Sequence, residues 1–416
     1  MVPKGWVATQ IGDIAKFSSG GTPSKQNANF WGGDKPWISG KDLKTHFIET
    51  SIDTLTDEGF QIAKRAPAGA SLILVRGMTL LKDFPVGFAI REVAFNQDLK
   101  ALVPNKNIDG LFLSFLLVSE KHKIKQLVST AGHGTGRLDT ESIKLYPINV
   151  PPITEQRKIA QILSAWDKAI TVTEKLLTNS LQQKQALMQQ LLTGKKRLLD
   201  DNGNNFHGEW KSFQIGTLLK EIKRPVQWND NDEYSLLSVK RRSEGVVLRE
   251  KLKGHQILTK KMNYVKSGDF LISKMQVVHG ATGLVTSEFN NHHISDSYIA
   301  LNSRNPSILD IQFFSWICKQ KVMYHKAYLC SYGVHIEKMT FNLQMYLQEK
   351  VCIPKTSEEQ QKIATVLSAA DAEISILEKK LACLKDEKKA LMQQLLTGKR
   401  RVSVPVKVEE KESVSA

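Results

Sequence analysis

The chain is poor in cysteine, and its cysteines form no recognisable cluster. Four are present, Cys318, Cys330, Cys352 and Cys383, separated by 12, 22 and 31 residues and without a CxxC pair. This spacing excludes a zinc-finger arrangement and the dense disulfide framework of a small secreted domain. Scattered thiols of this kind are typical of a reducing compartment, so we predict a cytoplasmic location.

Long apolar segments are also missing. Residues 1–6 lack the apolar core of a signal peptide. The longest apolar run, residues 111–118, is interrupted by Ser114 and is far shorter than the ~20 residues that a membrane-spanning helix requires. We therefore predict a soluble protein that makes no contact with a membrane.

Motifs that would indicate intrinsic catalysis are absent or incomplete. No GxxxxGK(S/T) phosphate loop occurs, and we interpret the glycine-rich residues 131–137 as a flexible loop rather than a dinucleotide site. His292, His293 and Asp296 have metal-binding side chains, but no second ligand cluster supports them, so a polar loop is the preferred interpretation. We predict no catalytic, cofactor-binding or metal site in this chain.

What the chain does have is an excess of positive charge. Its 416 residues contain 58 Lys and Arg against 42 Asp and Glu, a formal net charge of +16. Such an excess favours a polyanionic partner, with nucleic acid ahead of a membrane surface. The hydrophobic content of 41% is that of an ordinary globular protein, long enough for two or three domains.

An internal repeat organises the sequence. Residues 155–197 recur at 359–401 with a constant offset of 204, and 25 of the 43 aligned pairs are identical. The same offset relates Trp6 to Trp210, so the chain is a tandem duplication. We predict two variable domains, each followed by a copy of the repeated segment, and then a flexible tail, with boundaries at residues 1–152, 153–197, 198–355, 356–401 and 402–416.

The repeated segment is a helix by its period. Apolar residues recur in steps of four and three, the a/d pattern of a coiled coil. The positions are Ile159, Leu163, Trp166, Ile170, Thr173, Leu177, Ser180, Lys184, Leu187 and Leu191 in one copy, and Ile363, Leu367, Ala370, Ile374, Leu377, Leu381, Leu384, Lys388, Leu391 and Leu395 in the other. Two such helices, each ~57 Å long, most simply pair with each other as an antiparallel coiled coil. Lys184 and Lys388 either set the register or extend along the edge of the interface.

The variable regions combine short strands with a few helices. Residues 71–75 and 269–273 are apolar runs typical of buried strands. Residues 111–127 and 308–324 are predicted helices. The predicted fold class is therefore α+β: two mixed α/β domains in tandem, separated by two long helices.

Several polar and basic residues have the chemistry of DNA contacts. Basic and aromatic side chains alternate between residues 20 and 42, and Lys and Arg supply cations for phosphates while Asn and Gln can read base edges. Trp31 and Trp37 are assigned to the core. The predicted DNA-binding residues are Thr22, Ser24, Lys25, Lys35, Ser39, Lys41, Arg76, Asn96, Gln97, His133, Thr135, Arg137, Lys240, Arg241, Arg242, Lys274, Gln276, His279, Tyr332 and His335.

At this point the sequence resembles the DNA-specificity (S) subunit of type I restriction–modification systems. The marks are Gly20-Gly-Thr-Pro-Ser24, Trp37-Ile-Ser ending at Asp42, Phe95-Asn-Gln-Asp98, Val150-Pro-Pro before Glu155-Gln, and the duplicated Leu-Leu-Thr-Gly-Lys helix end. The second domain departs from the pattern, because it lacks the Gly-Gly-Thr-Pro-Ser block. Its DNA contacts rest less firmly on the resemblance.

The resemblance implies two target-recognition domains held apart by a coiled coil, each reading one half of a split DNA site. It also implies partners: double-stranded DNA, two modification (methyltransferase) subunits that use S-adenosylmethionine, and two restriction (translocase and nuclease) subunits that use ATP and Mg. No cofactor is expected in this chain. Two alternatives remain open: a self-contained DNA methyltransferase or nuclease, and a coiled-coil adaptor that binds DNA without sequence preference.

Overall fold

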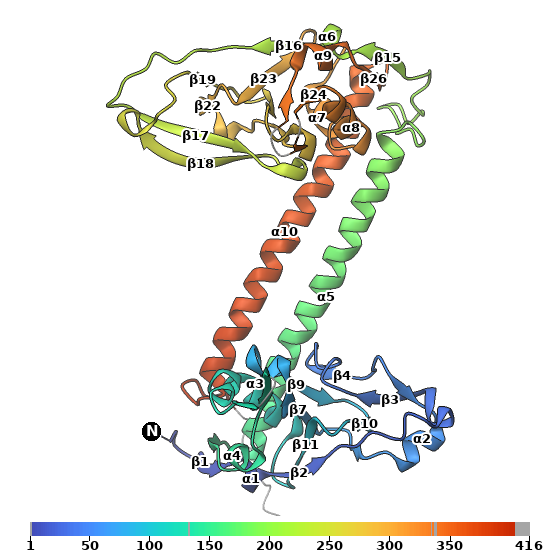
Figure 1. The fold of residues 1–416 in the computed structure, drawn as a ribbon, viewed down its shortest axis with the longest axis vertical. Helices are drawn as coiled ribbons and strands as arrows, with labels where there is room; N and C mark the ends of the chain where they lie inside the picture. Colours follow the sequence, from blue (N-terminus) through green and yellow to red (C-terminus); the bar gives the residue numbers. More distant parts are fainter. Residues whose placement is uncertain (1, 132–133, 334, 337–338, 404–416) are drawn as a thin grey trace, which may run out of the picture. The chain divides into compact units, whose positions relative to one another are not determined.

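The computed structural model describes residues 2–131, 134–333, 335–336 and 339–403. The chain divides into two compact units, each with its own core (Figure 1). Unit 1 consists of residues 1–174 and 379–416, and unit 2 consists of residues 175–378. Each unit therefore contains one globular part, the start of one long helix and the end of the other.

The elements of unit 1 begin with strand β1 and lead into the first long helix, α5. In chain order they are β1 (Val7–Gln10), α1 (Ile11–Ile14), β2 (Ala15–Ser19), η1 (Ala28–Phe30), β3 (Trp31–Ile38), β4 (Phe47–Ile48), β5 (Thr54–Leu55), α2 (Asp57–Ile62), β6 (Arg65–Ala66), β7 (Ser71–Leu74), β8 (Arg76–Gly77), η2 (Met78–Leu81), β9 (Val86–Ala89), β10 (Val93–Phe95), β11 (Leu99–Pro104), α3 (Gly110–Lys125), β12 (Ser129–Ala131), β13 (Thr135–Arg137), α4 (Thr140–Lys144), β14 (Pro147–Val150) and α5 (Ile153–Leu191).

The elements of unit 2 follow a similar order and lead into the second long helix, α10. They are β15 (Lys211–Gln214), α6 (Ile215–Leu218), β16 (Leu219–Ile222), β17 (Glu233–Val239), η4 (Arg241–Ser243), β18 (Val246–Lys253), η5 (Gly254–Gln256), β19 (Met262–Tyr264), β20 (Phe270–Ser273), η6 (Val277–His279), β21 (Thr282–Leu284), η7 (Ser287–Phe289), β22 (His293–Ser295), β23 (Tyr298–Ser303), α7 (Ile311–Ile317), α8 (Lys321–Leu329), β24 (Ser331–Tyr332), β25 (Thr340–Phe341), α9 (Leu343–Gln348), β26 (Lys350–Ile353) and α10 (Ser357–Leu395).

The two globular parts share one frame although their sequences differ. The sheet β2-β11-β7-β9-β4 of unit 1 corresponds to β16-β23-β20-β21 of unit 2, and β5-β3-β10-β6 corresponds to β18-β17-β22-β19. In each unit the first strand pairs with the last strand before the long helix, β1 with β14 and β15 with β26. The α+β fold and the tandem arrangement are confirmed. The variable regions, although they differ in sequence, also have a similar strand order.

The coiled-coil positions predicted for α5 and α10 are confirmed. All twenty a and d side chains are buried or half-buried along these helices. In unit 1 the core that contains Ile159 and Leu163 near the start of α5 also contains Leu395 at the end of α10. In unit 2 the core contains Leu191 at the end of α5 and Ile363 near the start of α10. Start packs against end in both units, so the helices run antiparallel.

Glycine ends both long helices, as the sequence predicts. Gly194 and Gly398 each have φ of 69°, the left-handed conformation that a side chain disfavours. The amides of Lys196 and Arg400 then donate to the carbonyls of Gln190 and Gln394, six residues earlier. These bonds satisfy a carbonyl in the last turn of each helix that has no partner within the helix itself.

In each unit an arginine just beyond one long helix forms an ion pair with a buried glutamate at the start of the other. Arg197, just beyond α5, donates two hydrogen bonds to Glu359 in the first turn of α10, at 2.6 and 2.7 Å. Arg401, just beyond α10, makes the same two bonds to Glu155 in the first turn of α5, at 2.7 Å each. Because these residues are related by the 204-residue offset, the duplication has produced the same bidentate contact twice.

A second duplicated ion pair lies at the polar a/d positions. Lys184 pairs with Asp371 in unit 2, and Lys388 pairs with Asp167 in unit 1, each joining one long helix to the other. Burial tends to raise the pKa of the Asp167 carboxyl, but the adjacent His46 and Lys388 outweigh it, so that pKa lies below its ordinary value. Contacts between helices favour the interpretation that these lysines set the register.

Two sequence interpretations are wrong in detail. The predicted helix over 308–324 is divided into α7 and α8, because Gln320 adopts an extended backbone and its side chain donates to the carbonyl of Leu192 at 3.3 Å. Within the loop predicted over 131–137, Ala131 ends strand β12 and Thr135–Arg137 form strand β13, which pairs with β12 on one side and β8 on the other, whereas residues 132–133 lie outside the described residues. No helix among the described residues is apolar over enough length to cross a bilayer.

The Arg197–Glu359 contact predicts a large stability effect. Glu359 has a side chain only 2% exposed, so Arg197→Gln leaves a buried carboxylate without its charged partner. We expect the free energy of unfolding to fall by about 3 kcal/mol, measured by urea denaturation of the full chain. Lys196→Gln, a neighbouring change at an exposed position, serves as the control. Equal stabilities for the two variants would contradict the role assigned to this ion pair.

Candidate nucleic-acid interface

Three predicted residues of unit 1 meet where the loops after β2, β3 and β10 converge. The Thr22 hydroxyl donates to the side-chain carbonyl of Gln97 at 2.6 Å. The backbone amide of Asn96 donates to the backbone carbonyl of Ile38 at 2.9 Å, which places the loop after β10 beside the loop after β3. The Asn96 side chain is buried, whereas the Gln97 side chain is exposed. Of these two side-chain amides, that of Gln97 is therefore the one accessible to a partner.

The loop after β3 is closed by a carboxylate. Both the backbone amide and the hydroxyl of Ser39 donate to Asp42 at 2.8 Å, and Asp42 also accepts from the amide of Ile52 at 2.8 Å. The hydroxyl of Ser39 therefore already has a hydrogen-bond partner within the loop. Lys41 between them is exposed, and the loop holds its backbone in place.

Two arginines face each other across neighbouring strands. Arg76 in β8 and Arg137 in β13 are direct partners in the antiparallel pairing. Both are exposed, and neither guanidinium forms an ion pair with any residue that the structure describes. Like charges directly opposite each other destabilise a sheet, and a bound anion removes that cost. This pair, with Thr135 in the same strand, is the most distinctive cationic feature of unit 1.

The remaining candidates of unit 1 lie apart from this centre or are already engaged. Lys35 pairs with Asp57 at 3.2 Å and Asp34 at 3.4 Å, and these two carboxylates, Asp57 first, raise the pKa of its ammonium. Ser24 and Lys25 are exposed in the loop after β2. His133 lies outside the described residues.

The two tryptophans of this region belong to the core, as predicted. Trp37 is 4% exposed, and its indole N–H donates to the carbonyl of Gly21 at 3.1 Å. Trp31 is half-buried and packs edge-on against Trp37, with 5.1 Å between the ring centroids. They therefore support the loop after β2 from within.

In unit 2 the corresponding loop is a strained basic turn. It joins β17 to β18 and contains Lys240, Arg241 and Arg242, all exposed. Because β17 pairs in parallel with β22 as β3 does with β10, this turn occupies the place of Ser39–Asp42 in unit 1. Arg242 and Ser243 have φ of 58° and 54°, a left-handed conformation that costs roughly 1–2 kcal/mol for each such residue.

Other candidates of unit 2 gather around that turn. The loop after β20 carries Lys274, Gln276 and His279, and its Gly280 carbonyl accepts from the amide of Ser243 in the turn, at 2.8 Å. The side-chain carbonyl of Gln276 is buried and has no hydrogen-bond partner among the described residues.

The hairpin β24–β25 approaches the same loop. The Phe341 amide in β25 donates to the carbonyl of Lys274 at 3.0 Å. Tyr332, 61% exposed, lies in β24, and His335 follows it as an exposed residue. In unit 2 the loop after β20 therefore contacts both the basic turn and strand β25.

Sequence reasoning missed residues that shape this interface. Ser243 and Tyr324 share a hydrogen bond of 2.6 Å across 81 residues of chain, and no local pattern links them. Met78, 74% exposed two residues beyond Arg76, was also missed. Long-range contacts of this kind leave no signal in a single sequence.

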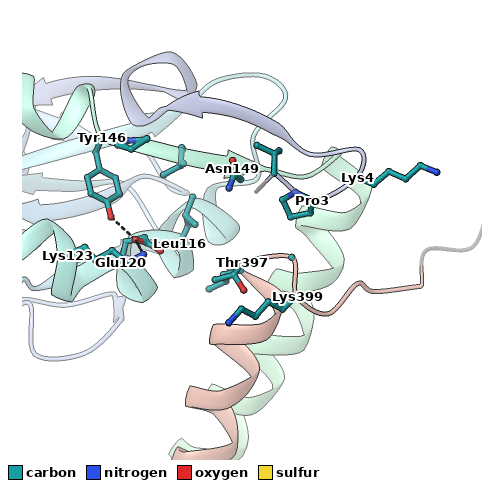
Figure 2. Close-up of a pocket in the computed structure, with 14 residues that line it drawn as sticks. Pro3, Lys4, Leu116, Glu120, Lys123, Tyr146, Asn149, Thr397 and Lys399 are labelled. Atoms are coloured by element: carbon teal, nitrogen blue, oxygen red, sulfur yellow. Dashed lines mark hydrogen bonds and ion pairs between the residues drawn. The ribbon is translucent and has the colours of Figure 1, made fainter.

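A groove of about 810 Å³ lies elsewhere in unit 1, among the start of the chain, α3, β14 and the end of α10 (Figure 2). Tyr146 donates to Glu120 at 2.6 Å on one wall, and Lys4, Lys123 and Lys399 also line the groove. Burial, followed by Glu120, raises the pKa of the Tyr146 phenol. The groove has no nucleophile–base pair and is best described as a basic recess.

A metal site finds no support in the described part of the chain. No group of three or more His, Cys, Asp or Glu side chains there lies close enough to hold an ion. His293 belongs to strand β22, and burial, ahead of other effects, lowers the pKa of its ring.

Comparison with known proteins gives a consistent result. A family model described as the type I restriction modification DNA specificity domain matches residues 3–183 and again residues 207–386. The Escherichia coli EcoR124I/EcoR124II specificity subunit is 33% identical over 174 residues, a match that spans only 41% of each protein. The Methanocaldococcus jannaschii MjaVIII specificity subunit is 23% identical over 96% of this chain and 94% of its own length.

Solved structures with the same fold include the type I restriction–modification S subunit of M. genitalium. It covers 95% of this chain and 99% of its own, with a TM-score of 0.62 at 14% identity. A chain from a study of complex assembly and conformational transition in the type I system gives a TM-score of 0.51 at 16% identity, covering 96% of this chain. At these identities the likeness shows the fold alone.

Proposed function

The chain belongs to the type I restriction modification DNA specificity family, and on that premise we propose that it is the non-catalytic subunit that selects the DNA sequence on which such a complex acts. In this proposal residues 1–152 form reading domain 1 and residues 198–355 form reading domain 2. Each reading domain contacts one half of a bipartite site in double-stranded DNA. Because the loops of the two domains differ while their frames correspond, the two half-sites differ in sequence.

The observation that carries the proposal is the opposed pair of Arg76 and Arg137. Neither guanidinium forms an ion pair with a described residue. The carboxylate of Asp139 is near enough to Arg137 to act on it electrostatically, so the like charges on adjacent strands are only partly compensated. Arginine binds phosphate oxygens bidentately, so a DNA backbone supplies the missing counter-charge. In this proposal Gln97, which is exposed in the loop after β10, contacts a base edge.

The coiled coil supplies the spacing between half-sites. Helices α5 and α10 contain 39 residues each, about 58 Å at 1.5 Å per residue. Half-sites one turn of duplex apart are separated by about 34–36 Å, within the reach of such a support. In this proposal the interhelical ion pairs of Lys184 and Lys388 set the helix register on which the spacing of the half-sites depends.

The helices also carry a repeated surface for protein partners. At their ends Ala186, Gln189, Gln190, Thr193 and Lys195 are exposed and identical to their counterparts Ala390, Gln393, Gln394, Thr397 and Lys399. By contrast, six consecutive pairs in the second half of each helix, 178–183 and 382–387, share no residue. Exposed residues are not needed for the core, so their identity in both copies supports a binding role. A surface that occurs twice can bind two copies of one partner, here the modification subunits.

The chemistry belongs to the partners in this proposal. The modification subunits use S-adenosylmethionine to methylate adenine, and two restriction subunits use ATP and Mg for translocation and cleavage. The complex acts on DNA in the cytoplasm. The basic recess of unit 1 includes Thr397 and Lys399, so it extends the repeated surface toward the start of the chain.

The arginine pair gives a quantitative prediction. Arg76→Ala and Arg137→Ala should each weaken binding of duplex DNA and lower the slope of log K against log salt by about 0.9, because each removes one phosphate contact. Fluorescence anisotropy over a salt series measures both quantities. Arg65→Ala is the matched control, since Arg65 is an exposed strand arginine paired with Glu92. Slopes equal to the control would remove the main support for this interface.

Modular recognition gives a separate prediction. Replacing residues 1–152 with the corresponding domain of another family member should change one half of the methylated site and leave the other half intact. Single-molecule sequencing of methylated adenines in cells that carry the complex provides the readout. The reciprocal exchange of residues 198–355 should alter only the opposite half. A swap that changes both halves, or neither, is incompatible with the proposal.

A further inference from the structure

The turn between β17 and β18 is held in an unusual conformation. Arg242 and Ser243 are consecutive non-glycine residues with positive φ, and Gly245 follows with φ of 92°. Residues in this region persist only where their surroundings over-determine them, and such positions cluster at functional sites. The surroundings of this turn therefore indicate what the conformation is for.

Contacts from two other segments fix the turn. The Ser243 amide donates to the carbonyl of Gly280, at 2.8 Å, and its hydroxyl lies 2.6 Å from the hydroxyl of Tyr324 in α8. Gly280 allows this approach, since a Cβ there would lie 2.3 Å from the Tyr324 ring. The turn is thus anchored through Ser243 to both the loop after β20 and helix α8.

Two basic side chains of the anchored turn are exposed and lack a partner of opposite charge in the part of the chain that the structure describes. Lys240 and Arg242 are exposed, and neither forms an ion pair with another described residue. The equivalent loop of reading domain 1 is different, because Asp42 closes it with a negative charge. The turn of reading domain 2 instead has a strained backbone, and its Lys240 and Arg242 have no ion-pair partner among the described residues.

We propose that Arg242 contacts a backbone phosphate of the second half-site, and that Ser243 and Tyr324 are positioning residues that pre-organise it. The inference rests on the proposed function and adds the residues through which reading domain 2 grips DNA. A guanidinium held on a fixed turn loses less conformational freedom on binding than one on a mobile loop, so anchoring strengthens the contact.

A double-mutant cycle tests the positioning role. The full chain, in complex with its modification subunits, is titrated with a labelled duplex that contains the site mapped by adenine methylation. We expect Arg242→Ala to weaken binding about tenfold and to lower the salt slope by about 0.9. Tyr324→Phe should weaken binding about fivefold with an unchanged slope, because Arg242 still reaches its phosphate. The double variant should bind no more weakly than Arg242→Ala alone.

Controls separate this inference from the proposed function. Arg249→Ala removes an exposed arginine of the same hairpin that already pairs with Glu250, so it should bind as the unchanged protein does. Ser243→Ala provides a second route to a loosened turn if Tyr324→Phe unfolds the domain. Additive losses in the cycle, or an Arg242→Ala variant with unchanged affinity, would overturn the inference. Failure of the unchanged complex to prefer the mapped duplex would instead overturn the proposed function.

Discussion

Within each unit the start of one long helix packs against the end of the other, and the rest of the chain is arranged around this pairing. Since α5 leaves one globular part and α10 returns from the other, neither unit is complete without residues from both halves of the sequence. The bidentate contacts Arg197–Glu359 and Arg401–Glu155 close the pairing at both ends with the same geometry. A duplication that preserved these residues could change the loops of the globular parts without changing the support that holds them.

Much of this support could be predicted from the sequence, because a coiled coil is encoded locally. The a/d positions of α5 and α10 are buried or half-buried as their spacing predicts, and Gly194 and Gly398 cap the helices. The break between α7 and α8 could not be predicted, since Gln320 leaves the helix to bind Leu192, more than a hundred residues away. Helical periodicity carries no information about such a partner.

The candidate interface, too, could be predicted from the sequence only in part. Residue types that suit DNA could be recognised, and the structure brings Thr22 beside Gln97 and Arg76 beside Arg137, from segments far apart in sequence. Which cations are already neutralised could not be recognised: Lys35 is held by two carboxylates, whereas Arg76 faces another arginine. Availability of a charge depends on tertiary neighbours, so composition alone overestimates the number of contacts.

The central claim is that the paired helices set the distance between two independent reading domains. The most direct measurement lengthens both helices by seven residues within their divergent segments, 178–183 and 382–387, which keeps the heptad register and the end contacts. Single-molecule mapping of methylated adenines then reports the recognised site. An added length of about 10.5 Å predicts unchanged half-sites separated by about three more base pairs. An unchanged spacer in a complex that still methylates DNA would contradict the claim.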